Sequence, residues 1–186
     1  MRVIGGMARG QRLIGPRSTG TRPTSDLVRE ALFDVIGPSV AGTGFLDLYA
    51  GTGAVGIEAL SRGARRAVFV EKNRRQVEVI RDNLARTRLA GRAEILPLDV
   101  ARALAELAND GQEFEFVFMD PPYRDPALPE VVAMAGGAVA QDGWLLVEHS
   151  HGTELPPPPG FGIVRRLRYG DTGITIFQRH REAEIT

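Results

Sequence analysis

The tetrapeptide Asp120-Pro121-Pro122-Tyr123 is the part of the chain best suited to chemistry. Pro122 fixes its own φ and holds Pro121 extended, so the Asp120 carboxylate and the Pro121 carbonyl become two rigid, adjacent acceptors. Two such acceptors can grip the N–H groups of an aromatic exocyclic amine and return the lone pair to its nitrogen, while Tyr123 stacks on the base. Asp120 can also accept the proton released after attack. The alternative is an ordinary proline-rich turn, but the acid and the aromatic that flank the prolines favour an active site.

A glycine-rich loop lies earlier in the chain, in the segment Asp47-Leu48-Tyr49-Ala50-Gly51-Thr52-Gly53. Its glycines allow a sharp turn and a close approach of a ligand to the backbone. Gly51, Gly53 and Gly56 also satisfy the GxGxxG fingerprint, so a nicotinamide dinucleotide is one interpretation and an empty turn is another. Asp47 favours a different ligand, S-adenosylmethionine (SAM), because a carboxylate there attracts a cationic methionyl group and repels a pyrophosphate.

Two more carboxylates follow predicted strands. Glu71 ends the second strand, where it can accept both ribose hydroxyls of an adenosine ligand. Asp99 follows the third strand and can accept a hydrogen bond from an adenine amino group. Ligands of open α/β sheets bind beyond the carboxyl ends of the strands, so these residues and Asp47 predict one nucleoside site.

The charge of the chain is unevenly distributed. The 186 residues carry 23 basic and 23 acidic side chains, which excludes a uniformly basic nucleic-acid coat. Residues 1–29, however, contain six arginines and a single acidic residue, Asp26. This asymmetry indicates either an arm that contacts a polyanion or an ordinary solvated surface.

Several classes of site are excluded by composition. The chain has no cysteine, which rules out disulfides, thiolate metal sites and methylation of pyrimidine C5 through a cysteine adduct. The histidines, His149, His151 and His180, are too scattered to predict a metal site, and we expect the first two to be exposed loop residues. Neither a membrane span nor a signal peptide is visible, so we expect a cytoplasmic protein.

Apolar strands alternate with helices from residue 44 onward. Strands are expected over 45–49, 67–70, 93–96, 114–119 and 144–148, and helices over 54–62, 74–86, 101–108 and 128–140. This order predicts an α/β fold with a doubly wound parallel sheet covered on both faces. Two final strands, 163–169 and 172–178, flank Gly170-Asp171 and predict a hairpin that closes the sheet.

The first 37 residues form a different pattern. Residues 2–5 and 11–14 are expected to be short strands around a glycine-rich turn. A helix is expected to start after Thr24-Ser25-Asp26, which are good N-cap residues, and to stop at Gly37-Pro38. We therefore expect an N-terminal extension of hairpin and helix over 1–37, followed by the α/β domain over 38–186.

The chain resembles, over nearly its whole length, the RsmD family of 16S ribosomal RNA guanine-N2 methyltransferases, which are class I SAM-dependent methyltransferases. The resemblance rests on the two motifs above, on Met1-Arg2-Val3-Ile4-Gly5-Gly6, and on the block from Thr21-Arg22-Pro23-Thr24-Ser25-Asp26 to Phe33. It implies a Rossmann-like, seven-stranded, mostly parallel sheet with a reversed last strand. It also implies methylation of one guanine amino group of 16S rRNA, within the partly or fully assembled small (30S) subunit. We expect the enzyme to be a monomer without a metal.

The resemblance assigns roles to residues of this sequence. The base would be received by Asp120, Pro121, Pro122 and Tyr123. SAM would be held by Asp47, Tyr49, Ala50, Gly51, Gly53, Glu71, Lys72, Asp99, Val100 and Thr24. RNA would be contacted by Arg9, Arg12, Arg17, Arg22 and Arg166.

Two other classes of function stay open at this point. One is a SAM-dependent methyltransferase acting on a DNA adenine or a protein glutamine, although related enzymes for those amines more often carry asparagine where this chain has Asp120. The other is a nicotinamide-dependent oxidoreductase or a non-catalytic nucleotide-binding module, which the GxGxxG spacing supports.

Overall fold

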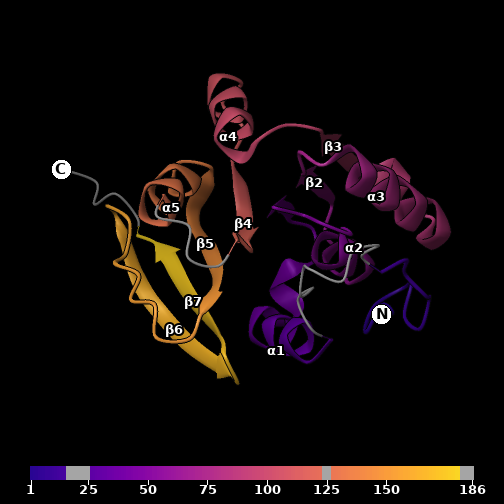
Figure 1. Ribbon diagram of the computed structural model, residues 1–186, viewed down its shortest axis with the longest axis horizontal. Coiled ribbons are helices and arrows are strands. Elements are labelled where there is room, and N and C mark those ends of the chain that lie inside the picture. The colour runs from indigo at the N-terminus through magenta and orange to yellow at the C-terminus, as the bar shows by residue number, and fades with distance from the viewer. Residues whose placement is uncertain (16–25, 123–126, 181–186) are drawn as a thin grey trace.

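A computed structural model describes residues 1–15, 26–122 and 127–180 of the chain. Within these residues, seven strands form a single sheet in the order β3-β2-β1-β4-β5-β7-β6 (Figure 1). The strands are β1 (Gly44–Leu48), β2 (Arg66–Val70), β3 (Ala93–Leu96), β4 (Phe114–Met119), β5 (Val139–Ser150), β6 (Phe161–Tyr169) and β7 (Thr172–Arg179). The pairs from β3 to β5 are parallel, and β7 is antiparallel to both β5 and β6. The expected mostly parallel sheet with a reversed last strand is therefore confirmed, with β7 inserted between β5 and the edge strand β6.

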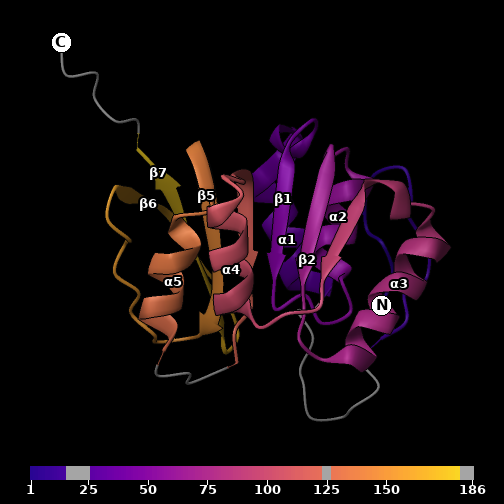
Figure 2. The same cartoon turned by 90° about the horizontal axis from the view of Figure 1, so that it is seen from above.

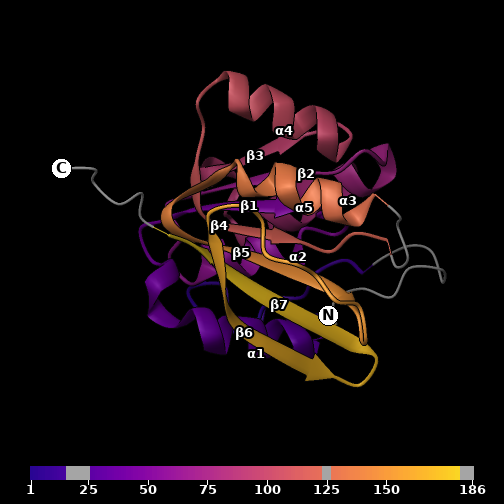
Figure 3. The same ribbon diagram turned by 90° about the vertical axis from the view of Figure 1, so that its left-hand side faces the viewer.

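Helices cover both faces of the sheet (Figures 2 and 3). They are α1 (Asp26–Ile36), α2 (Ala54–Ser61), α3 (Arg74–Thr87), α4 (Val100–Asn109) and α5 (Leu128–Gly136), with short 3₁₀ turns at Gly37–Val40 and Ala90–Arg92. One apolar core joins α1, α2 and α3 to one face, and a second joins α4 and α5 to the other. Since both faces are covered, the central strands are apolar throughout, and β1 is buried at every position.

The parallel strands place their carboxyl ends side by side. Leu48 at the end of β1 is in register with Val70 of β2 on one side and with Met119 of β4 on the other. The residues that follow these strands therefore meet at one end of the sheet, which we call the carboxyl end. Three candidates from the sequence lie at this end: the glycine-rich loop after β1, Glu71 after β2 and Asp120 after β4.

The largest departure from the expected elements concerns α5. The sequence pattern predicted a helix over 128–140, but α5 ends at Gly136 and Val139 already belongs to β5. Gly136 and Gly137 weaken the helix, and Val139 instead pairs with Phe114 of β4. As a result β5 has 12 residues, more than twice the expected length.

The first 15 residues, which we call the N-terminal arm, lie against the face that carries α2 and α3. A single antiparallel bridge between Arg2 and Arg12 takes the place of the two expected strands. Val3, Ala8 and Leu13 are buried in the same apolar core as α1 and α2. Gly6 has a φ of 75° and approaches α2 so closely that a Cβ atom there would lie 1.9 Å from the carbonyl oxygen of Ser61. The arm is thus packed against the α/β core by its own side chains and backbone.

Candidate active site

The loop after β1 has an unusual backbone. Tyr49, Gly51 and Gly53 have φ values of 61°, 55° and 75°. The turn is closed by hydrogen bonds from Ala50 N to the Val70 oxygen (3.0 Å) and from Gly53 N to the Ala50 oxygen (2.7 Å). A left-handed tyrosine is rare, and backbone strain of this kind gathers at ligand sites. The Cβ direction of Gly51 is open, its nearest neighbour being the Tyr49 oxygen at 3.9 Å. We call residues 49–53 the glycine loop.

The third glycine of the fingerprint has a packing role. A Cβ atom on Gly56 would lie 2.4 Å from Cε1 of Phe69 on β2, so only glycine lets α2 approach the sheet this closely. Helix–strand packing of this kind is the third glycine's role in dinucleotide-binding folds as well. Gly56 therefore satisfies the GxGxxG spacing without distinguishing a dinucleotide from another ligand.

Asp47 lies beneath the glycine loop. Its side chain is almost completely buried, and its Oδ2 accepts a hydrogen bond from Gly56 N at 2.8 Å. Burial raises the pKa of Asp47 to about 7; the hydrogen bond from Gly56 opposes this, while the charges of Asp120 and Glu71 add to it. The Asp47 side chain thus braces the first turn of α2, and in its ionised form it adds a negative charge to those of Glu71 and Asp120.

Glu71 connects the end of β2 to the glycine loop. Its Oε2 accepts from Gly51 N at 2.9 Å, and its Oε1 accepts from Asn73 N, just before α3, at 2.8 Å. Each carboxylate oxygen can accept more than one hydrogen bond, so Glu71 can still receive the hydroxyls of a ribose. Its position beside the open Gly51 fits the role expected from the sequence.

Asp99 and Lys72 form the outer side of this region. Asp99 caps α4 by accepting from Ala101 N at 3.1 Å, and Lys72 Nζ lies 3.4 Å from its Oδ2. Both side chains are more than half exposed, whereas Val100 is buried in the first turn of α4. Asp99 and Lys72 are therefore accessible to a ligand lying across the ends of β2 and β3.

The proposed base-binding motif begins directly after β4. Asp120 is half-buried and its N–H reaches the Leu48 oxygen at 3.5 Å, which ties it to the end of β1. Pro121 is buried and Pro122 is exposed. Tyr123 and the cofactor candidate Thr24 lie outside the described residues. The described part of the motif faces the same end of the sheet as the glycine loop.

Of the arginines expected to contact RNA, the three that the structure describes, Arg9, Arg12 and Arg166, lie in two separate regions. Arg9 and Arg12 are exposed on the N-terminal arm, while Arg17 and Arg22 fall in residues 16–25, which are not described. In the turn of the arm, Met7 N donates to the Ser61 oxygen at 2.8 Å. Ser61 is the last residue of α2, whereas the glycine loop precedes the first. Arg166 is exposed on β6, paired with Thr175 of β7, so three strand spacings, roughly 14 Å, separate it from β4.

The expectation that His149 is an exposed loop residue is wrong. It belongs to β5 and is buried, with Nδ1 2.9 Å from the Ser150 oxygen and Nε2 2.8 Å from Thr175 Oγ1. Burial lowers its pKa, and the nearby Arg166 and His151 act in the same direction. His151, by contrast, is exposed. A neutral His149 donates through Nδ1 to the carbonyl and accepts from the threonine hydroxyl.

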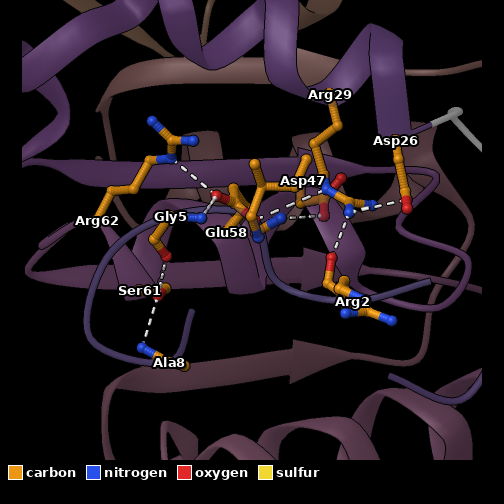
Figure 4. A network of polar contacts seen from close by, with 11 residues as sticks. Arg2, Gly5, Ala8, Asp26, Arg29, Asp47, Glu58, Ser61 and Arg62 are labelled. Atoms are coloured by element: carbon orange, nitrogen blue, oxygen red, sulfur yellow. Dashed lines mark hydrogen bonds and ion pairs between the residues drawn. The ribbon is translucent and has the colours of Figure 1, made fainter. Parts of the chain in front are cut away.

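A buried polar network that the sequence reasoning missed fixes the arm beside α2 (Figure 4). Glu58 of α2 is fully buried and accepts from Ile4 N at 2.8 Å and from Gly5 N at 2.7 Å. Arg29 of α1, also fully buried, donates from Nη2 to the Arg2 oxygen at 2.6 Å, and its Nε lies 3.7 Å from Glu58. The one available signal was a lone charged residue, Glu58, inside the otherwise apolar helix α2.

Two other kinds of site are absent from the residues that the structure describes. In the ranges 1–15, 26–122 and 127–180, no helix combines the length and apolarity needed to cross a membrane. The same part of the chain contains no cluster of three or more histidine, aspartate or glutamate side chains arranged to bind a metal ion.

Known proteins are similar in sequence to the chain over nearly its whole length. The family model described as Conserved hypothetical protein 95 matches residues 1–178. Ribosomal RNA small subunit methyltransferase D of Escherichia coli (strain K12) is 36% identical over 187 residues, covering 99% of this chain and 92% of that protein. Its Haemophilus influenzae counterpart is 28% identical and covers 96% and 93%.

Solved structures agree with these sequence matches. The structure of yhhF from Escherichia coli superimposes with a TM-score of 0.84 at 34% identity, covering 98% of this chain and 99% of that one. That of the Thermus hypothetical protein TTHA0928 gives 0.82 at 35% identity, covering 95% and 98%. The fold is that of the class I methyltransferases, and the chain belongs to the Conserved hypothetical protein 95 family, the RsmD family.

Proposed function

We propose that this protein is a SAM-dependent methyltransferase of ribosomal RNA, and that it methylates the exocyclic N2 amine of a guanine in the 16S rRNA of the small subunit. The observation that carries the proposal is the convergence of the glycine loop, Glu71 and Asp120 at the carboxyl end of one sheet. Relatives named ribosomal RNA small subunit methyltransferase D support an rRNA substrate.

The cofactor is S-adenosyl-L-methionine, which supplies an electrophilic methyl group on a positively charged sulfur. The residues present suit such a cation, because three acids lie close together: beyond the effect of burial, the charges of Asp120 and Glu71 raise the pKa of Asp47. Tyr49, Ala50, Gly51 and Gly53 present backbone to the cofactor, and Glu71 receives the ribose. Lys72, Asp99 and Val100 border the adenine, and Thr24 is assigned to the cofactor by its sequence motif alone.

The base is held by the motif after β4. Asp120 and the Pro121 carbonyl accept hydrogen bonds from the guanine amine, and Tyr123 stacks on the ring. Gripping both N–H groups orients the nitrogen lone pair toward the methyl donor, and Asp120 accepts the proton that the amine loses. Most of the rate enhancement then comes from positioning and electrostatics rather than from a covalent adduct.

The RNA around the target base is proposed to contact arginines on both sides of the site. Arg9, Arg12, Arg17 and Arg22 supply phosphate contacts from residues 1–37, which act as the RNA-binding extension, and Arg166 supplies one from β6. We further propose that the protein acts in the cytoplasm as a monomer, on the partly or fully assembled 30S subunit.

The experiment is nucleoside mass spectrometry of small-subunit RNA from a strain that lacks the gene, after incubation with SAM and the purified protein. N2-methylguanosine is expected with the wild type, and at least 100-fold less with Asp120→Ala, which keeps cofactor binding. Methyl transfer from SAM to a DNA adenine or to a protein glutamine instead, seen by mass spectrometry of DNA nucleosides and of peptides, would replace the guanine assignment with the alternative amine. Stabilisation by NAD and not by SAM in a thermal-shift assay would contradict the assignment of SAM as the cofactor.

A further inference from the structure

Asn83 of α3 is fully buried and bonded to two segments that are far apart in the sequence. Its Oδ1 accepts from Ile14 N at 2.7 Å. Its Nδ2 donates to the Ile14 oxygen at 3.2 Å and to the Thr52 oxygen at 2.9 Å. One N–H and two carbonyls surround the amide, so only this orientation satisfies all of them. A single side chain therefore joins the N-terminal arm to the glycine loop.

Asn83 contacts only backbone atoms of these two segments, those of Ile14 in the arm and of Thr52 in the glycine loop. Ile14 forms hydrogen bonds to Asn83 through both its N–H and its C=O, as a residue paired with a neighbouring β-strand does. Thr52 stands between Gly51 and Gly53, both in the left-handed region, so its carbonyl direction reports the shape of the loop. A buried polar group left without a partner costs about 1–3 kcal/mol. A change in the orientation of the Asn83 amide that breaks its bonds to the arm therefore also disturbs its bond to the glycine loop, which costs free energy.

We propose that Asn83 is a positioning residue that couples docking of the arm to the cofactor-binding shape of the glycine loop. The proposal rests on the assignment of that loop to SAM made under Proposed function, and it is independent of which base is methylated. Other polar contacts of the arm lead elsewhere: Ile4 and Gly5 bond to Glu58 of α2, Ala8 N bonds to Ser61 Oγ of α2 at 2.9 Å, and the Arg2 oxygen accepts from Arg29 of α1.

Linkage gives this arrangement a measurable consequence. If cofactor binding favours the loop shape in which Thr52 accepts from Asn83, it must also favour the docked arm, and by the same factor the docked arm must favour the cofactor. The arm carries the exposed Arg9 and Arg12, so the same side chain would connect cofactor loading to the phosphate contacts proposed for the arm. We expect a coupling of roughly fivefold to twentyfold.

The first experiment is hydrogen exchange of the wild-type protein with and without S-adenosylhomocysteine (SAH), followed at single amides. Saturating SAH is expected to slow exchange at Ile14 by at least about threefold. Phe161 is the internal control, because its amide bonds to the Pro158 oxygen at the start of the edge strand β6, outside the arm and away from the glycine loop, and its exchange should change little. The amides of Gly51 and Gly53 report independently whether SAH sits at the loop, which separates a failure of the coupling from a failure of the cofactor assignment.

The second experiment compares Asn83→Asp with Thr87→Val. Asp keeps an acceptor for Ile14 N but replaces the donor to the Thr52 and Ile14 oxygens with an oxygen. Thr87 is buried one turn further along α3, and its Oγ1 donates only within the helix, to the Asn83 oxygen at 2.8 Å. The Asn83→Asp variant should raise the Kd of SAH fivefold to twentyfold, raise the KM for SAM with kcat restored at saturation, and abolish the Ile14 response. The Thr87→Val control should stay within twofold of wild type.

Two results would overturn the proposal. One is protection of Gly51 and Gly53 by SAH with no change at Ile14 in the wild type. The other is a folded Asn83→Asp protein that is less stable but binds SAH as tightly as the wild type, since that outcome assigns Asn83 a purely structural role. If Asn83→Asp fails to fold, the wild-type exchange measurement alone decides.

Discussion

The carboxylate of Asp47 on β1 accepts a hydrogen bond from Gly56 of α2 at 2.8 Å, and this pair joins the central strand to the helix that follows the glycine loop. Burial and two neighbouring acids raise the pKa of this carboxylate to about 7. The group that supports the loop therefore changes charge close to neutral pH, which has consequences for binding and for stability.

Cofactor affinity should depend on pH through Asp47. A bound sulfonium favours the ionised carboxylate, so SAM should bind more tightly at pH 8 than at pH 6 and release protons on binding near pH 7. SAH lacks the sulfonium charge and should show a weaker dependence. Calorimetry in buffers of different ionisation enthalpy measures the proton release. An Asp47→Asn protein with the same pH dependence as the wild type would assign the effect to another group.

Stability should respond to pH in the opposite sense. The pKa of Asp47 is higher in the folded protein than its ordinary value of 3.8, so between these two pKa values the folded state holds a proton that the unfolded state has lost. This contribution to the free energy of unfolding is present below about pH 4 and is lost as pH rises through 7. Relative to wild type, Asp47→Asn should gain stability between pH 4 and pH 8, by at most about 4 kcal/mol. Urea titrations at both pH values measure it, and a constant difference would contradict the assignment.

The packing of Gly56 against Phe69 predicts a large effect of a small substitution. Gly56→Ala places a methyl group 2.4 Å from Phe69 Cε1, so it should destabilise the fold by about 1–3 kcal/mol. Gly91→Ala is the matched control, because no atom lies within 4 Å of its Cβ direction and its φ is not in the left-handed region. Equal free energies of unfolding for the two variants would show that α2 can move away from the sheet at little cost.

The buried network around Glu58 predicts how the arm can be released. Glu58→Gln removes the charge that α2 presents to Arg29, and breaking a buried ion pair in this way costs at most about 3–5 kcal/mol, because Asp26 still lies 3.0 Å from Arg29 Nη2. The arm should then be cleaved faster by trypsin at Arg9 and Arg12. Glu78→Gln, whose partner Arg81 is exposed like itself, should change the stability by less than about 0.5 kcal/mol. An arm that stays resistant in Glu58→Gln would mean that its apolar contacts suffice.

The sequence predicted the elements well wherever a local pattern determines them. The strands β3 and β4 have the expected bounds, and Asp47 near the end of β1 lies close to Glu71 after β2 and Asp120 after β4, as the parallel order requires. These results follow from apolar periodicity and from the direction of the strands.

The errors and omissions share a different cause. Burial of His149 depends on pairing with Thr175, which is 26 residues away, and the roles of Asn83 and Glu58 depend on partners 69 and 54 residues away. Such pairings leave no local signal in a single sequence. The end of α5 at Gly136 is similar, because pairing of Val139 with β4 outweighs the helical pattern.

The most direct test of the account is a crystal structure of the protein with SAH. The account predicts the adenosine between Glu71 and Asp99, the glycine loop against the ligand, and the sulfur facing the Asp120 carboxylate and the Pro121 carbonyl. SAH bound away from the carboxyl end of the sheet, or an Asp120 side chain turned away from the sulfur, would contradict it.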